Sequence, residues 1–308
     1  MNLQQLKYVV AVNRFRNFAK AAKACNVSQP TLSAMLQKLE EELDIRIFER
    51  SNKLVTPTAI GEKIIHQAER TLQEIGRIGE ILSEEKGQIN GKFALSVGPT
   101  IAPYILPQFI KYYRMSFPSV DLSIQEMKAD FMLNALEKGE LDAGIAISGN
   151  VCDGMLEIPL YTEKFMVYLA ESCWRKLPVF KPENLEHENM WIMKDAQCLR
   201  DSAFSFCKSR SIGKHIYEAG SITTLVRIVD ENGGFTIIPE MHLSFLSDKQ
   251  RKNVRRIDGD YRSQRQISLY IREDYIRQRM LNTITDTLKQ FMPEGMLFER
   301  IVEHGIKL

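Results

Sequence analysis

The sequence predicts a helical N-terminal module followed by a larger α/β region. Apolar residues recur at helical spacing through residues 1–58 and again from Thr58 to about Glu85. From Lys92 onward, short apolar runs alternate with helical patterns, which is typical of an α/β sheet. With 308 residues, the chain is too long for one compact core and is expected to form two or three domains.

Three short helices are predicted in the N-terminal module. The first is amphipathic, the second is rich in alanine, and a tight break at residues 26–27 precedes the third. Ser28 is a good N-cap for this third helix, and Pro30 falls in its first turn, where a missing N–H costs little. The predicted buried stripe of the third helix consists of Leu32, Met35, Leu36, Leu39 and Leu43.

The opposite face of the third helix carries small polar side chains and a cation. Such side chains suit contact with base edges and phosphates, and glutamine can bond adenine in a bidentate way. A basic turn between two short apolar stretches follows, and this is typical of a wing along the DNA backbone. The sequence therefore predicts an all-α winged helix-turn-helix whose DNA-contacting residues are Ser28, Gln29, Pro30, Thr31, Ser33, Gln37, Lys38, Arg50 and Lys53. The alternative is an ordinary three-helix bundle with a polar face.

Charge is distributed unevenly along the chain. Residues 1–58 contain nine Lys or Arg against five acids, whereas the whole chain has a net charge of only +2. A basic end of this kind favours phosphate contact, although a solvated surface explains a modest excess equally well.

A single long helix is predicted from Thr58 to about Glu85. Two rows of residues repeat every seven positions, which is typical of a helix that pairs with another helix. These rows are Ala68, Ile75 and Leu82, and Ile64, Thr71 and Ile78. The alternative is packing against its own domain.

The region after Lys92 is expected to form two α/β subdomains. Strands are predicted at 93–97, 120–126, 141–147, 165–170, 235–238 and 267–271, and helices at 103–117, 131–138 and 279–291. Thr100, Gln125 and Ser148 lie near the ends of predicted strands, where open α/β sheets bind ligands. The alternative is that each is an ordinary turn residue. The expected domains are 1–58, 59–88 and 89–308, with subdomain I at about 89–162 and 268–308 and subdomain II at about 163–267.

Five cysteines are present, and two of them, Cys198 and Cys207, lie nine residues apart. An odd number makes a structural disulfide framework unlikely in a reducing compartment, and neither a CxxC pair nor zinc spacing occurs. Cationic neighbours of Cys198 favour the thiolate, which peroxide oxidises, but Asp201 opposes this effect. On spacing alone, two unrelated buried cysteines remain an alternative.

Several N-terminal motifs resemble the LysR-type regulators in order and spacing. They comprise residues 18–22 and 27–33, the run Phe48–Arg50 and residues 56–61. The resemblance implies a winged helix-turn-helix on double-stranded promoter DNA, a dimerising linker helix and an effector domain shaped like a periplasmic binding protein. It also implies a homodimer or homotetramer.

Later motifs resemble the peroxide-sensing members of this family. They comprise residues 191–193, 198–201, 206–207 and 233–239. The resemblance implies that Cys198 forms a sulfenic acid with hydrogen peroxide and that Cys207 resolves it to a disulfide. It also places Arg265 near the reactive thiol and gives Thr100 a role in holding peroxide.

Two positions depart from that pattern. Gln125 and Ala129 stand where better-known relatives have histidine and threonine, so Asp201 and Ser202 are expected to complete the peroxide environment. If residues 199–206 are helical, the two cysteine Cα atoms lie roughly 13 Å apart, whereas a disulfide needs about 4.4–6.8 Å. Oxidation would then require this segment to rearrange.

The expected function is therefore a peroxide-responsive transcription regulator that is not an enzyme and needs no cofactor or metal. A regulator of the same family that senses a small metabolite, with inert cysteines, is the first alternative, and a thiol peroxidase is the second. RNA polymerase and a cellular thiol reductant are expected as further partners. The N-terminal segment lacks a secretory pattern and no apolar run spans a membrane, so a cytoplasmic protein is expected.

Overall fold

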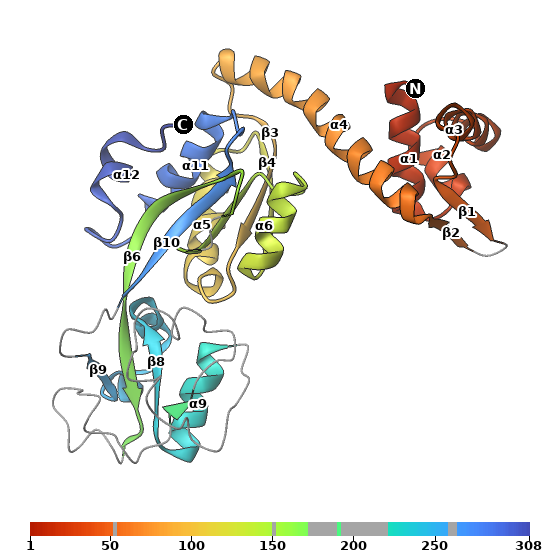
Figure 1. Cartoon of the computed structure of the whole chain (residues 1–308). Coiled ribbons are helices and arrows are strands. Elements are labelled where there is room, and N and C mark those ends of the chain that lie inside the picture. The colour runs from red at the N-terminus through yellow and green to blue at the C-terminus, as the bar shows by residue number, and fades with distance from the viewer. Residues whose placement is uncertain (52–53, 150–151, 172–189, 192–220, 258–263) are drawn as a thin grey trace. The chain divides into compact units, whose positions relative to one another are not determined.

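A computed structural model describes residues 1–51, 54–149, 152–171, 190–191, 221–257 and 264–308 (Figure 1). The chain divides into two compact units. The first comprises Met1–Gln88 and Asn134–Glu140, and the second comprises Ile89–Leu133 and Leu141–Leu308.

The first unit contains the predicted helices and wing. Its elements are α1 (Leu3–Phe15), α2 (Phe18–Ala24), α3 (Gln29–Leu43), β1 (Phe48–Ser51), β2 (Leu54–Pro57) and α4 (Ala59–Glu85), and β1 pairs antiparallel with β2. Side-chain caps begin the first three helices, since Asn2, Asn17 and Ser28 each accept a backbone N–H three residues ahead. A shared core of buried residues joins the helices, including Val9, Val12, Ala21, Leu32, Leu36, Leu39, Ile47 and Ile65.

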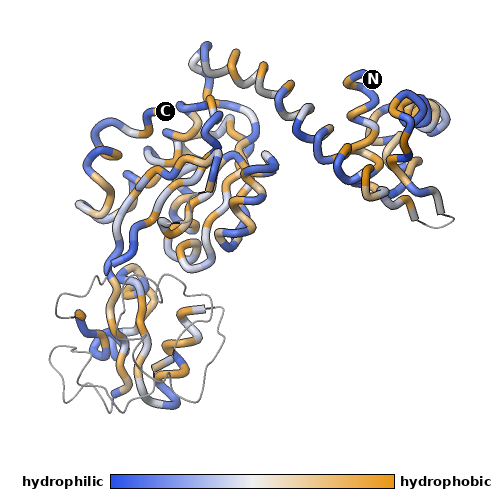
Figure 2. Tube along the Cα trace, in the orientation of Figure 1, coloured by the Kyte–Doolittle hydropathy of each residue, from blue (hydrophilic) through white to orange (hydrophobic). Residues whose placement is uncertain are grey.

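The long helix α4 has two different halves. Ile65 and Ala68 are buried in the core of the first unit, whereas Ile78 and Leu82 are 61% and 56% exposed. Figure 2 shows apolar and polar segments alternating along this helix, as expected for an amphipathic helix. Packing against its own domain therefore describes the N-terminal half of α4, while the C-terminal half presents an apolar face to solvent in this single chain.

The second unit is built on a mixed sheet with the strand order β4-β3-β5-β10-β6-β8-β7, with β9 also paired to β6. The strands are β3 (Gly91–Val97), β4 (Val120–Glu126), β5 (Ala143–Ile147), β6 (Met155–Leu169), β7 (Met190–Trp191), β8 (Phe235–Pro239), β9 (Val254–Arg256) and β10 (Gln264–Arg272). The helices are α5 (Ala102–Ser116), α6 (Ala129–Glu137), α9 (Ile222–Asn232), η3 (Glu240–Phe245), α10 (Asp248–Arg251), α11 (Gln278–Leu288) and α12 (Glu299–His304). Of α6, only the part up to Leu133 belongs to the second unit. The β3, β4 and β5 strands are parallel, and β10 is antiparallel to both β5 and β6.

The long strand β6 passes through two hydrophobic cores (Figure 1). Ile158, Leu160 and Tyr161 belong to the core that contains α5 and α11, and Val167 and Leu169 belong to the core that contains α9 and β8. The prediction that this strand begins at Phe165 is wrong, because it begins at Met155. Glu157, Pro159 and Glu163 interrupt the apolar pattern and hide the continuity of the strand in the sequence.

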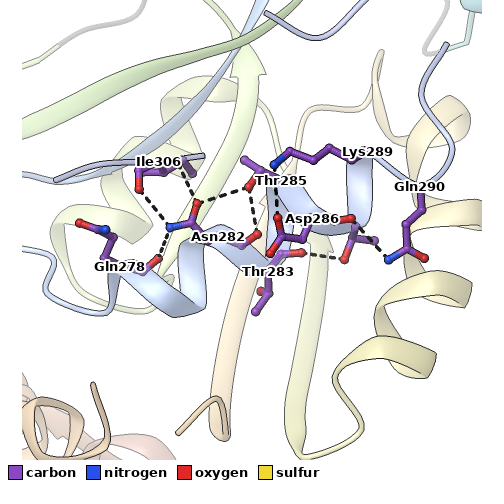
Figure 3. Close-up of polar contacts among 9 residues, drawn as sticks. Gln278, Asn282, Thr283, Thr285, Asp286, Lys289, Gln290 and Ile306 are labelled. Carbon is purple, nitrogen blue, oxygen red and sulfur yellow. Dashed lines mark hydrogen bonds and ion pairs between the residues drawn. The ribbon is translucent and has the colours of Figure 1, made fainter. Parts of the chain in front are cut away.

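Helix α11 closes the first of these cores, and it lies where a helix was predicted at 279–291, although the shorter α12 follows it. Met280, Leu281, Ile284 and Leu288 are buried on its apolar side. Figure 3 shows its polar side, where Asn282 binds the C-terminal segment. The Asn282 amide donates to the Ile306 carbonyl at 3.0 Å and accepts the Ile306 N–H at 2.7 Å.

Candidate functional site

The first candidate surface is the polar face at the start of α3. Leu32, Leu36 and Leu39 are buried on one side of this helix, so the predicted DNA-contacting residues lie on the other side. Gln29, Pro30, Thr31, Gln37 and Lys38 are exposed, and Ser33 is half-buried. The arrangement leaves a convex, largely polar helix face free to approach a groove in DNA.

Two of these residues also have a structural role. The Ser28 hydroxyl caps α3 by accepting the Thr31 N–H at 3.3 Å, and the two hydroxyls lie 2.7 Å apart. The Gln37 amide donates to Glu41 at 2.9 Å. Lys53 and the Arg50 side chain lie outside the described part of the structure, so their predicted phosphate contacts stay predictions.

The second candidate surface surrounds Arg265, on β10 of the second unit. The Arg265 guanidinium donates from Nη1 to Thr100 Oγ1 at 3.1 Å and from Nη2 to the Thr100 carbonyl at 3.0 Å. The structure thus joins two of the residues predicted for the peroxide environment, although 165 positions separate them in the chain. Arg265 is only 5% exposed, so its charged guanidinium is largely shielded from solvent.

Glu163 completes this arrangement, and it was not among the residues predicted from the sequence. Its Oε2 atom accepts from Arg265 Nε at 2.8 Å and lies 2.7 Å from Arg265 Nη2. A signal existed in the alternation of β6, because Tyr161, Glu163, Phe165 and Val167 share one buried face. An acid on such a face requires a cation, and β10 provides it directly opposite.

A second polar pair lies next to Glu163. The Met241 N–H donates to Glu163 Oε1 at 3.1 Å, and the following residue, His242, has its Nδ1 atom 2.9 Å from the Tyr104 hydroxyl. Burial lowers the pKa of His242 to about 4, so this imidazole is neutral near pH 7. Burial also raises the pKa of Tyr104, which remains a phenol. These contacts tie η3 to β6 and α5.

The remaining candidates near strand ends have ordinary surroundings. The Ser148 hydroxyl lies 2.6 Å from the Ser268 hydroxyl and accepts from Gln266 at 3.0 Å, so it is a satisfied turn residue. Gln125 is exposed at the end of β4, and Ala129 is half-buried at the start of α6.

The predicted redox-active cysteines, Cys198 and Cys207, lie outside the described residues, as do Asp201 and Ser202 of the predicted peroxide environment. Two other cysteines are described as free thiols, the half-buried Cys25 and the exposed Cys152. Burial raises the pKa of the Cys25 thiol, which disfavours its reactive thiolate. No group of three or more metal-ligating side chains occurs among the described residues.

Two family descriptions match the chain. The family described as "Bacterial regulatory helix-turn-helix protein, lysR family" matches residues 3–62, and that described as "LysR substrate binding domain" matches residues 86–293. The chain belongs to the LysR family of bacterial regulators. This confirms the predicted helix-turn-helix and α/β regulatory region, and LysR-type proteins are transcription regulators rather than a class of enzyme.

Comparison with individual members of the LysR family shows which of its regulators this chain resembles. A hydrogen peroxide-inducible genes activator from Haemophilus influenzae is 32% identical over 83% of this chain and 85% of its own length. A full-length OxyR variant from Pseudomonas aeruginosa has a TM-score of 0.75 at 26% identity, covering 97% of this chain and 98% of its own. A hydrogen peroxide-bound OxyR mutant from Corynebacterium glutamicum has a TM-score of 0.58 at 26% identity, covering 94% and 92%. The predicted resemblance to the peroxide-sensing members of the LysR family is confirmed.

Among the helices that the structure describes, none is long and apolar enough to cross a membrane.

Proposed function

We propose that this LysR-family chain is a cytoplasmic, DNA-binding transcription regulator that senses hydrogen peroxide through a reversible Cys198–Cys207 disulfide and controls oxidative-stress genes. The observation that carries the proposal is the buried Arg265 guanidinium bound to Thr100 in a chain 32% identical to a hydrogen peroxide-inducible genes activator. A fixed cation and a hydroxyl are groups that favour a thiolate and hold a peroxide oxygen.

In the proposed reaction, the Cys198 thiolate attacks one peroxide oxygen. An S–O bond forms, the O–O bond breaks, and the leaving hydroxide takes up a proton to give water. The Cys207 thiol then attacks the sulfenic sulfur, which forms the disulfide and releases a second water. A cellular thiol reductant returns both cysteines to the reduced state, and the protein, which acts once per switching event, is not an enzyme in this scheme. Asp201 and Ser202 belong to the proposed peroxide environment, with Gln125 near it.

The proposed output lies in the N-terminal module. Residues 1–58 bind double-stranded promoter DNA through α3 and the wing, residues 59–88 pair two chains, and residues 89–308 sense peroxide. Within the sensing part, subdomain I comprises about 89–162 and 268–308. A dimer places two copies of α3 on successive major grooves. We further infer that chains assemble into a tetramer. RNA polymerase is an additional inferred partner.

Intact mass spectrometry after stoichiometric peroxide tests this proposal. We expect the loss of two hydrogens, mapped to Cys198 and Cys207, and none in Cys198→Ser. Cys152→Ser is the matched control, because Cys152 is an exposed free thiol outside the proposed mechanism, and it should behave as the parent chain.

DNA footprints with and without peroxide test the link to regulation. We expect the footprint to change length in the parent chain and to stay constant in Cys198→Ser. An equal response of both proteins would favour a metabolite-sensing regulator, and continuous consumption of peroxide with a reductant would favour a thiol peroxidase.

A further inference from the structure

Glu163 and Arg265 form a buried ion pair between β6 and β10. They occupy directly opposed positions in the antiparallel register of these strands, and they are 1% and 5% exposed. Burying a carboxylate and a guanidinium is unfavourable unless hydrogen bonds satisfy both groups. The geometry meets this requirement on both sides of the pair.

Both carboxylate oxygens of Glu163 are in use. Oε2 accepts from Arg265 Nε at 2.8 Å and lies 2.7 Å from Nη2, and Oε1 accepts from the Met241 N–H at 3.1 Å. The backbone donor at the start of η3 therefore fixes the rotation of the carboxylate. Glu163 consequently presents Oε2 to Arg265 in a single orientation.

The orientation of the carboxylate also determines that of the guanidinium. Guanidinium N–H groups form a rigid planar fork, so occupying the Nε–Nη2 edge determines where Nη1 points. Here Nη1 donates to Thr100 Oγ1 at 3.1 Å, and Nη2 also donates to the Thr100 carbonyl at 3.0 Å. The Phe165 ring lies 5.6 Å from the guanidinium carbon and supports it from a third side.

We propose that Glu163 is a positioning residue, which holds the Arg265 guanidinium in the orientation that binds Thr100. This inference rests on the proposed function, in which Arg265 and Thr100 serve the reaction with hydrogen peroxide. Glu163 acts through Arg265 and does not itself contact peroxide in this proposal.

Removing the Glu163 carboxylate affects the rate of thiol oxidation in two opposite ways, one through the charge near Arg265 and one through the position of the guanidinium. Glu163→Gln leaves an uncompensated cation, and a stronger positive field favours a thiolate, so charge alone predicts faster oxidation. Loss of orientation predicts slower oxidation, since a displacement of about 1 Å at a reacting site costs up to about 100-fold. The direction of the rate change therefore distinguishes the two roles.

The experiment is a double-mutant cycle on the full chain, measured as the rate of Cys198–Cys207 disulfide formation with hydrogen peroxide. We expect Glu163→Gln to react about 10- to 100-fold more slowly than the parent chain. Adding Glu163→Gln to Arg265→Met should change the rate by less than about twofold, because the residue through which Glu163 acts is already gone. Lys164→Gln is the matched control, since Lys164 is exposed on the same strand.

Further readouts separate positioning from a general loss of structure. The rate of Glu163→Gln should be lower across the whole pH profile without a rise in the apparent pKa of the thiol, and a misfolded fraction would lower the amplitude rather than the rate. If Glu163→Gln does not fold, Glu163→Asp replaces it, because it keeps the charge and withdraws the carboxylate by one methylene. We expect an intermediate rate for Glu163→Asp.

Two results would overturn the inference. One is a rate for Glu163→Gln, or for Glu163→Asp in its place, that equals or exceeds that of the parent chain. The other is an equal slowing by Glu163→Gln in the presence and absence of Arg265. A parent chain that forms no disulfide with peroxide would refute the proposed function first, and the inference with it.

Discussion

His242 is a histidine that the fold keeps neutral. It is 2% exposed, its ring stacks on Phe245, and burial lowers its pKa to about 4. In the unfolded chain a histidine has a pKa of about 6.5, so between these values the unfolded state binds a proton that the folded state does not. Its contribution to stability is therefore complete above pH 6.5 and is lost as the pH falls towards 4.

We expect the free energy of unfolding to fall across this window by at most about 1.4 kcal/mol per pH unit from this residue. Urea unfolding at several pH values between 7 and 4.5 measures the slope. In His242→Gln the slope should be shallower than in the parent chain, because the buried imidazole is gone. Identical slopes in His242→Gln and the parent chain would contradict this assignment.

Among the secondary-structure elements, helix α11 carries one asparagine, Asn282, that binds the chain segment following α12. The Asn282 side chain makes hydrogen bonds with Gln278 and with both backbone groups of Ile306 (Figure 3). Asn282→Ala should lower the free energy of unfolding by about 1–3 kcal/mol, since it leaves buried backbone groups without partners. Gln290→Ala, an exposed change two residues beyond the end of α11, should cost less than about 0.5 kcal/mol. Thermal or urea unfolding compares the two, and equal losses would argue against this role.

For the whole molecule, the exposed apolar half of α4 leads us to expect that two chains associate through this helix. Ile75, Ile78, Ile81 and Leu82 are between 37% and 61% exposed, which leaves a continuous apolar stripe on one chain. Ile78→Glu should weaken self-association at least about tenfold, because a charge would be buried at the predicted helix pair. Sedimentation velocity across a concentration series measures this. Gln67→Glu adds the same charge at an exposed site nearer the N-terminus of α4 and should have little effect, whereas equal effects would contradict pairing through the stripe.

Much of the fold could be predicted from short-range patterns. The Ser28 cap, the leucine stripe of α3 and the runs that became β3, β5 and β8 each depend on residues within one helical turn or one strand. The start of β6 could not be predicted, because Glu157, Pro159 and Glu163 break the apolar pattern although the strand continues through them. The strand tolerates these residues because β10 pairs with β6 from Met155 to Lys164.

Local periodicity and capping were enough to predict the helix-turn-helix, the long amphipathic helix and the α/β character of the second unit. A family resemblance pointed to Arg265 and Thr100. That these two residues bind each other, and that Glu163 binds the same guanidinium, is visible only in the folded chain. The reason is that these contacts join positions 102 and 165 residues apart, so they depend on the register of β10 against β6 and on no pattern in the neighbouring sequence.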